Sequence, residues 1–187
     1  MVSIISLWFP IIISAIAVFI LSSIIHMVLP YHKSDFRKLP REDEVRDALR
    51  NAHIPKGEYM FPYAAESKER KSQEFRDKLN KGPVGIITIF PSGSFNMGSN
   101  LVMWFLYCIV VSVFAAYVAG HALIPGAIFR SVFRFTGITA FSGYCLALIQ
   151  DSIWFRKSWA TTIKSLFDGF IYALFTALIF GWLWPSR

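Results

Sequence analysis

The sequence predicts an all-α membrane protein with four transmembrane helices and a partly ordered polar loop between the first and second helices. Two observations favour this fold class. The chain is 55% hydrophobic and 17% aromatic, with a mean hydropathy of +0.47, which is too apolar for an ordinary soluble domain of 187 residues. Thirteen of the nineteen basic residues and ten of the twelve acidic residues lie within 31–99. We therefore expect a transmembrane helix in 1–30, a cytoplasmic loop region in 31–99 and three further transmembrane helices in 100–187.

The first apolar run covers residues 4–29 and contains no charged side chain. A secretory signal would carry a basic region before a shorter apolar core, and this segment has neither feature. The run is long enough to cross a hydrocarbon core of about 30 Å. Pro10 lies in its first turns, where a missing backbone N–H is tolerated. We predict an uncleaved transmembrane helix.

The polar segment 31–99 shows several local signals. Proline and acidic residues at 40–44 begin a helix with one apolar face, and a second, highly charged helix is expected over Glu66–Asn80. Residues 54–63 are rich in proline and aromatics and are expected to be extended. Pro83–Phe90 is apolar and too short to cross a bilayer, so it is a strand, an interfacial segment or a shallow re-entrant segment.

The second, third and fourth spans are expected at 101–124, 127–149 and 163–184. Stripes of small side chains run along each of them at helical spacing, and such stripes let helices approach closely in lipid. We predict that the second and third spans form a hairpin packed stripe to stripe. The two stripes are Cys108, Ser112, Ala115 and Ala119, and Thr136, Ala140, Gly143 and Ala147. A further stripe on the fourth span contains Gly169, Ala173, Ala177 and Gly181.

Orientation follows from the basic residues. They concentrate in 31–99 and in the connection 151–164, whereas the opposite side of the predicted bundle carries only Arg130 and Arg187. The positive-inside rule then places both polar connections in the cytoplasm and both termini outside. The expected location is the inner membrane of a bacterium.

Arg130 and Arg134 lie in the first two turns of the third span and point away from the small-residue stripe. A guanidinium cannot lose its proton, so within a membrane it must extend to the headgroups or bind an anion. Two interpretations stay open. Either both side chains reach the outer headgroups, or they bind an anionic lipid or an acidic group on a partner protein.

Asp168 lies within the fourth span, one turn after Lys164. The simpler interpretation is structural, because the helix dipole favours an acid near the N-terminus and Lys164 can neutralise it. The alternative is an ion or proton site near the inner face, to which His26 would also contribute. Depth in the membrane excludes a haem held by His26 and His121. A site that combines His26 with His32 or His53 stays open, although we expect neither a bound metal nor a cofactor.

No catalytic motif occurs in the sequence. It contains no HExxH, P-loop or GxGxxG motif, and the two cysteines, Cys108 and Cys145, lack CxxC spacing. The basic residues are interleaved with acids, which disfavours nucleic-acid binding. The expected function is therefore a non-catalytic accessory or structural subunit of a larger membrane assembly. It would dock on lipid and on other membrane subunits through exposed helix faces and the 31–99 loop. The alternatives are a small oligomeric transporter or channel that uses Asp168 and His26, and a lipid-modifying enzyme that uses scattered histidines and acids.

Overall fold

The computed structural model describes residues 1–93 and 96–186, and these residues divide into two compact units. The helical bundle comprises Met1–Phe36 and Asn96–Arg187, and the loop unit comprises Arg37–Phe95. The protein is mostly helical (68%). The predicted all-α fold class is confirmed, with one small β-sheet added in the loop unit.

The described residues contain four helices that are long and apolar enough to cross a membrane. Their length and composition are those of an integral membrane protein. The first is α1 (Trp8–Met27), which continues a 3₁₀ turn over Ile5–Leu7; the second is α5 (Met97–Ala122). The third span covers Phe129–Trp154 and the fourth is α8 (Trp159–Trp182).

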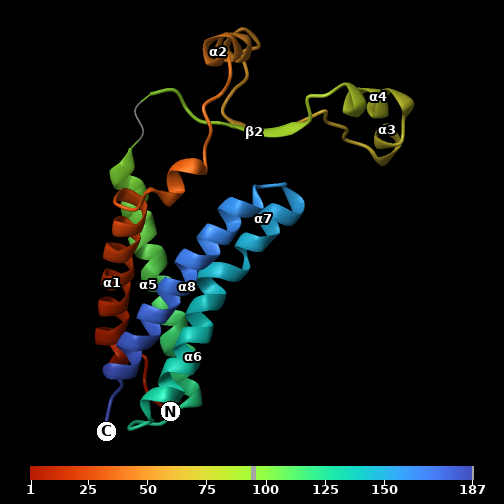
Figure 1. The fold of residues 1–187 in the computed structure, drawn as a ribbon. Helices are drawn as coiled ribbons and strands as arrows, with labels where there is room; N and C mark the ends of the chain where they lie inside the picture. Colours follow the sequence, from red (N-terminus) through yellow and green to blue (C-terminus); the bar gives the residue numbers. More distant parts are fainter. Residues whose placement is uncertain (94–95, 187) are drawn as a thin grey trace. The chain divides into compact units, whose positions relative to one another are not determined.

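The four helices run side by side, and each packs mainly against two neighbours (Figure 1). Helix α1 contacts α5 and α8, and the third span contacts the same two helices from the opposite side. Both chain termini lie at one end of the bundle, which we call the terminal end (Figure 1). The opposite end, where α1 finishes and the third span connects to α8, is the loop end.

The third span is not a continuous α-helix. It consists of α6 (Phe129–Phe141), a π-helical turn (Ser142–Leu146) and α7 (Leu148–Trp154). A π turn contains one extra residue, which rotates the following side chains by about 100° relative to a regular helix. The turn directs Tyr144 into the bundle, where it is 5% exposed.

This rotation changes the predicted hairpin seam. All four small residues on α5 are fully buried, as are Thr136 and Ala140 on α6. Gly143 and Ala147, which follow the start of the π turn, are exposed. Gly143 still lies against α5, since a Cβ added there would be 3.2 Å from the Val111 side chain. Only the first half of the second stripe is therefore buried, because the π turn rotates the remainder away from the seam.

The stripe on α8 packs against the third span. Ala173 and Ala177 are buried, and Gly137 approaches Ala177 so closely that an added Cβ would be 3.1 Å from the alanine methyl. At Gly169 an added Cβ would lie 2.5 Å from Cys145 Sγ. The backbone of α8 thus meets the π turn with no room for a side chain.

The terminal end is closed by backbone hydrogen bonds. The amide of Val2 donates to the Gly120 carbonyl (2.7 Å), and the amide of Gly126 donates to the Pro185 carbonyl (2.7 Å). Leu7, Val132 and Phe180 are fully buried there. These contacts fix the turn between α5 and α6 against both ends of the chain.

The loop unit contains α2 (Glu42–Asn51), α3 (Ser67–Arg70), α4 (Gln73–Lys81) and a two-stranded antiparallel sheet. Strand β1 (Gly57–Phe61) pairs with β2 (Gly85–Ile89). Of the three alternatives for Pro83–Phe90, the structure shows the strand. The helix expected over Glu66–Asn80 is interrupted, because the Ser72 hydroxyl accepts the Phe75 amide (3.1 Å) and begins a new helix there.

Candidate functional site

A cluster of ionisable side chains lies at the loop end of the bundle. Helix α1 finishes at Met27, and Leu29 is extended, as a residue before proline prefers. Pro30 then begins a 3₁₀ turn over Pro30–Ser34. We call it the α1–α8 turn, because it follows α1 in the chain and packs against α8. This turn brings Tyr31 and His32 against α8.

The centre of the cluster is Asp168 on α8, which is only 3% exposed. Its carboxylate accepts a hydrogen bond from the Tyr31 hydroxyl and lies 2.8 Å from Nε2 of His32. Burial and the contact with Asp168 raise the pKa of Tyr31, so that its hydroxyl stays protonated and donates. A buried carboxylate on a membrane-spanning helix is unfavourable unless such partners surround it.

The second carboxylate of the cluster, Asp35, bonds the other side of the His32 ring. Its Oδ2 lies 2.6 Å from His32 Nδ1, and its Oδ1 accepts a hydrogen bond from Lys164 Nζ (2.8 Å). The hydrogen bond from Lys164 holds the pKa of the Asp35 carboxyl below its usual value, against the opposing effect of burial. Asp35 is therefore an ionised acceptor, and Nδ1 of His32 carries a proton.

Lys164 holds the α1–α8 turn in place. Besides Asp35, its ammonium donates to the Tyr31 carbonyl (2.6 Å) and the Ser34 hydroxyl (2.8 Å). The sequence interpretation paired Lys164 with Asp168, one helical turn away. In the structure the α1–α8 turn supplies the partners of both side chains, because it packs over the face of α8 that they share.

His26, in the last turn of α1, completes the cluster. Its ring stacks on His32, with ring centroids 4.5 Å apart and an interplanar angle of 9°. Its Nδ1 lies 3.0 Å from the Ser22 carbonyl, which can only accept, so Nδ1 carries the proton and Nε2 has a free lone pair. His26, His32 and Asp168 each offer one ligand atom, and these three atoms lie within 4.8 Å of one another.

The cluster borders a partly open cavity of about 280 Å³ between the helices of the bundle. Asp168 and His26 form its ionisable side, and aromatic side chains form much of the remainder. These aromatic residues are Trp104, Tyr107, Tyr144 and Tyr172. The hydroxyls of Tyr144 and Tyr172 are buried and have no hydrogen-bond partner among the described residues. Such hydroxyls favour a cavity that takes a polar ligand or water.

Sequence reasoning identified part of this site. It singled out Asp168, Lys164 and His26, which the structure brings into one cluster. It left His32 and His53 as alternative partners of His26, and the structure joins His32 to the cluster. In the loop unit, His53 Nδ1 lies 2.7 Å from the Asn51 carbonyl. His121 lies near the terminal end, beside the Tyr117 carbonyl.

Tyr31, Asp35 and the aromatic residues around the cavity were missed. The available signal was the density of polar groups in Pro30-Tyr-His-Lys-Ser-Asp35 directly after an apolar span. Assigning that stretch to the loop concealed its contact with α8. Trp104, which lines the cavity, donates from Nε1 to the Ser22 hydroxyl (2.8 Å).

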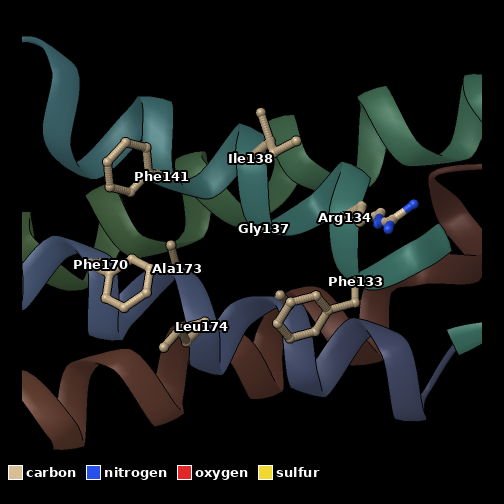
Figure 2. A pocket seen from close by; sticks show the side chains of 9 residues that line it. Phe133, Arg134, Gly137, Ile138, Phe141, Phe170, Ala173 and Leu174 are labelled. Carbon is tan, nitrogen blue, oxygen red and sulfur yellow. The ribbon is translucent and has the colours of Figure 1, made fainter. Parts of the chain in front are cut away.

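A second cavity, of about 360 Å³, is an apolar groove between α6 and α8. Arg134 lies at one end of this groove, and its guanidinium extends away from Phe141 and Phe170 (Figure 2). Arg130 and Arg134 are both exposed. Within residues 1–93 and 96–186, no carboxylate forms an ion pair with either arginine.

No protein-family model, curated protein or solved structure matches this chain.

Proposed function

We propose that this protein is a small membrane transporter or channel that binds a cation at the ionisable cluster of the loop end. The observation that carries the proposal is Asp168, a carboxylate buried within a membrane-spanning helix beside a cavity. Ionisable groups inside membrane spans are unfavourable and characteristically mark ion pathways. Here the carboxylate has ordered partners on one side and the cavity on the other.

The chemistry of the cavity supports a cation rather than an anion. The groups that border it are a carboxylate, an imidazole with a free Nε2 and tyrosine hydroxyls, all of which offer lone pairs. The lysine of the cluster, Lys164, bonds the α1–α8 turn and is absent from the residues that line the cavity. A single bundle has only four spans. We therefore expect the protein to carry out this function as an oligomer in the membrane.

The proposed location is the inner membrane of a bacterium, with the loop end in the cytoplasm and both termini outside. The support is the density of basic residues in 31–99 and in 151–164. The test is labelling of intact cells with an impermeant thiol reagent. Ser67→Cys should resist labelling and Ser186→Cys should react, while the native Cys108 and Cys145 are buried. The reverse pattern would overturn the orientation.

Flux measurements in proteoliposomes test the function. Purified protein reconstituted into vesicles should carry a cation from a panel of monovalent and divalent ions, and Asp168→Asn should reduce that flux at least tenfold. Asp151→Asn is the matched control, because Asp151 is half exposed and pairs with Lys157 near the connection to α8. Flux that is absent for every ion, or equal in wild type and Asp168→Asn, would overturn the proposal.

A second candidate function is the non-catalytic accessory subunit, and Arg134 is the observation that favours it. An exposed arginine at the end of an apolar groove suits a lipid with an anionic headgroup or an acidic segment of another membrane protein. Native mass spectrometry of gently solubilised protein separates the two functions. A transporter should appear as an oligomer of this chain, and an accessory subunit should appear with unlike chains.

A further inference from the structure

We propose that His26, His32 and Asp168 form a binding site for a divalent transition-metal ion such as Zn²⁺. This inference rests on the proposed function in one respect, because it names the class of cation that the site takes. The binding site itself is argued from the positions of the three side chains and would stand without transport.

The hydrogen bonds of the two histidines leave Nε2 as the free nitrogen of each ring. Nδ1 of His26 donates to the Ser22 carbonyl, and Nδ1 of His32 donates to Asp35. In a neutral imidazole the remaining Nε2 is then an acceptor. Nε2 of His32 and the Asp168 carboxylate are thus two acceptors only 2.8 Å apart, and a positive centre between them would remove their repulsion.

A proton on Nε2 of His32 would form a hydrogen bond within that pair but would leave Nε2 of His26 without a partner. Its Nε2 has no hydrogen-bond partner among the described residues, although its ring is stacked on His32 beside Asp168. A metal ion accounts for all three groups at once. It accepts two imidazole lone pairs and one carboxylate oxygen, a donor set that suits Zn²⁺, Fe²⁺ and related ions.

The spacing fits such an ion after a small closure. With bonds of about 2.1 Å, two ligands at a right angle are about 3.0 Å apart and two opposite ligands about 4.2 Å apart. His32 Nε2 and Asp168 Oδ2 are already 2.8 Å apart, and no two of the three ligand atoms are more than 4.8 Å apart. The remaining closure falls to His26, whose residue is exposed at the end of α1 and whose side chain can therefore adjust toward the other two ligands.

Each ligand also has a supporting group of the kind found around metal centres. Ligating histidines usually donate their second N–H to a carboxylate or a backbone carbonyl, which fixes the ring and raises its basicity. Asp35 supplies the carboxylate for His32, and Ser22 supplies the carbonyl for His26. The Tyr31 hydroxyl orients the Asp168 carboxylate in the same way.

Three protein ligands leave at least one coordination position open, and the cavity of about 280 Å³ borders His26 and Asp168. The hydroxyl of Tyr172, 4% exposed and without a partner in the described parts of the chain, also borders this space. A water molecule or exchangeable ligand on the metal would be its natural partner. Two imidazole nitrogens disfavour Ca²⁺ and Mg²⁺, which prefer oxygen ligands.

The test is metal binding by tag-free protein in detergent, stripped with a chelator and titrated with Zn²⁺ by calorimetry and with Co²⁺ by visible absorption. We expect one ion per chain and Co²⁺ bands typical of nitrogen and oxygen ligands. His26→Ala should weaken binding at least tenfold, and Asp35→Asn, which removes the charge behind His32 but no ligand, should weaken it about 10–100-fold. His121→Ala is the matched control and should bind as wild type does.

The fold of each variant is verified by its elution as a single species at the wild-type position. Because His26 is exposed, His26→Ala tests the site even where Asp168→Asn fails to fold. Zn²⁺ binding that is absent from wild type, or unchanged in His26→Ala, would overturn the metal site. Asp168-dependent flux of another cation would then leave the proposed function intact. Metal binding without any flux would support the site and overturn the transport function.

Discussion

Asp168 and Arg134 are both charged residues on predicted membrane spans, but their surroundings in the structure are opposite. Asp168 is 3% exposed and is bonded by side chains from the α1–α8 turn. Arg134 is exposed at the edge of an apolar groove between two helices. One charge is enclosed by partners from distant parts of the chain, and the other faces the surroundings of the bundle.

The difference is that side chains of the described residues stabilise the charge of Asp168 and do not stabilise that of Arg134. The partners of Asp168 are separated from it by more than 130 residues in sequence, and Lys164 holds their backbone in place. Such an arrangement orders several side chains and is maintained only where the packing fixes them. The groove beside Arg134 has apolar walls, and no carboxylate of the described residues pairs with that guanidinium.

The largest expected effect is the loss of Asp168. Asp168→Leu removes the acceptor of the Tyr31 hydroxyl and the neighbour of His32 Nε2, and these two half-buried groups then lack their partner on α8. The lost hydrogen bond of Tyr31 and the apolar side chain placed among polar groups should lower the free energy of unfolding by about 2–4 kcal/mol. Arg134→Leu should change it by less than about 0.5 kcal/mol, because the exposed arginine has no protein partner in the described residues. Unfolding in a mixed detergent series measures both, and equal effects would remove the contrast between the two sites.

The contact between α8 and the π turn gives the next largest effect. Gly169→Ala would place a Cβ 2.5 Å from Cys145 Sγ and 3.2 Å from the Tyr144 carbonyl oxygen. The helix must move outward, which should cost about 1–3 kcal/mol and disturb the cavity that Tyr144 borders. Gly98→Ala is the control, since its added Cβ would meet only Asn96 Oδ1 at an ordinary 3.4 Å. A tolerated Gly169→Ala would show that α8 and the π turn are not closely packed.

The sequence predicted the four spans because each is a long, apolar run whose signal is local. It also identified the α5 stripe and the buried first half of the α6 stripe, whose spacing follows the regular helix. The predicted stripe was wrong after Phe141. The π turn in Ser142–Leu146 has no clear compositional signal, and it rotates the side chains that follow relative to a regular helix. The positions of Gly143 and Ala147 could not be predicted for this reason.

The candidate site was predicted in part for a similar physical reason. Asp168 and Lys164 were noticed because charges in an apolar helix are rare. Their true partners lie in a 3₁₀ turn about 130 residues earlier in the chain, and no periodicity links the two segments. Pro30 could have indicated that the chain turns sharply there. The side of the bundle to which it turns depends on tertiary packing.

Packing changes between α5 and the third span are expected to have an effect of similar size or smaller. Ala115→Leu should cost about 1–3 kcal/mol, because Ala115 is fully buried in the seam. Gly143→Leu should cost less, because Gly143 is exposed and meets only Val111. Thermal unfolding in detergent gives the ranking. An effect at Gly143 as large as that at Ala115 would mean that the π turn does not rotate the stripe.

Arg134→Lys should have the smallest effect on stability. Its expected effect is on the binding of anionic lipid. Lysine keeps the charge but cannot form two parallel hydrogen bonds to a phosphate or carboxylate. Native mass spectrometry should show weaker retention of anionic lipid in Arg134→Lys, with a lesser change in Arg130→Lys, which lies outside the groove. Unchanged lipid retention in both variants, and in Arg134→Leu, would mean that the two arginines only reach the headgroups.

In the proposed metal site the enclosed charge, Asp168, is a cation ligand together with His26 and His32. The most direct measurement is the X-ray absorption spectrum at the zinc edge of wild-type protein, loaded with one equivalent of Zn²⁺ in lipid nanodiscs. We expect coordination by two imidazole nitrogens and by oxygen ligands at about 2.0–2.2 Å, with one imidazole fewer in His26→Ala. A shell of oxygen ligands alone, or a spectrum that His26→Ala leaves unchanged, would contradict it.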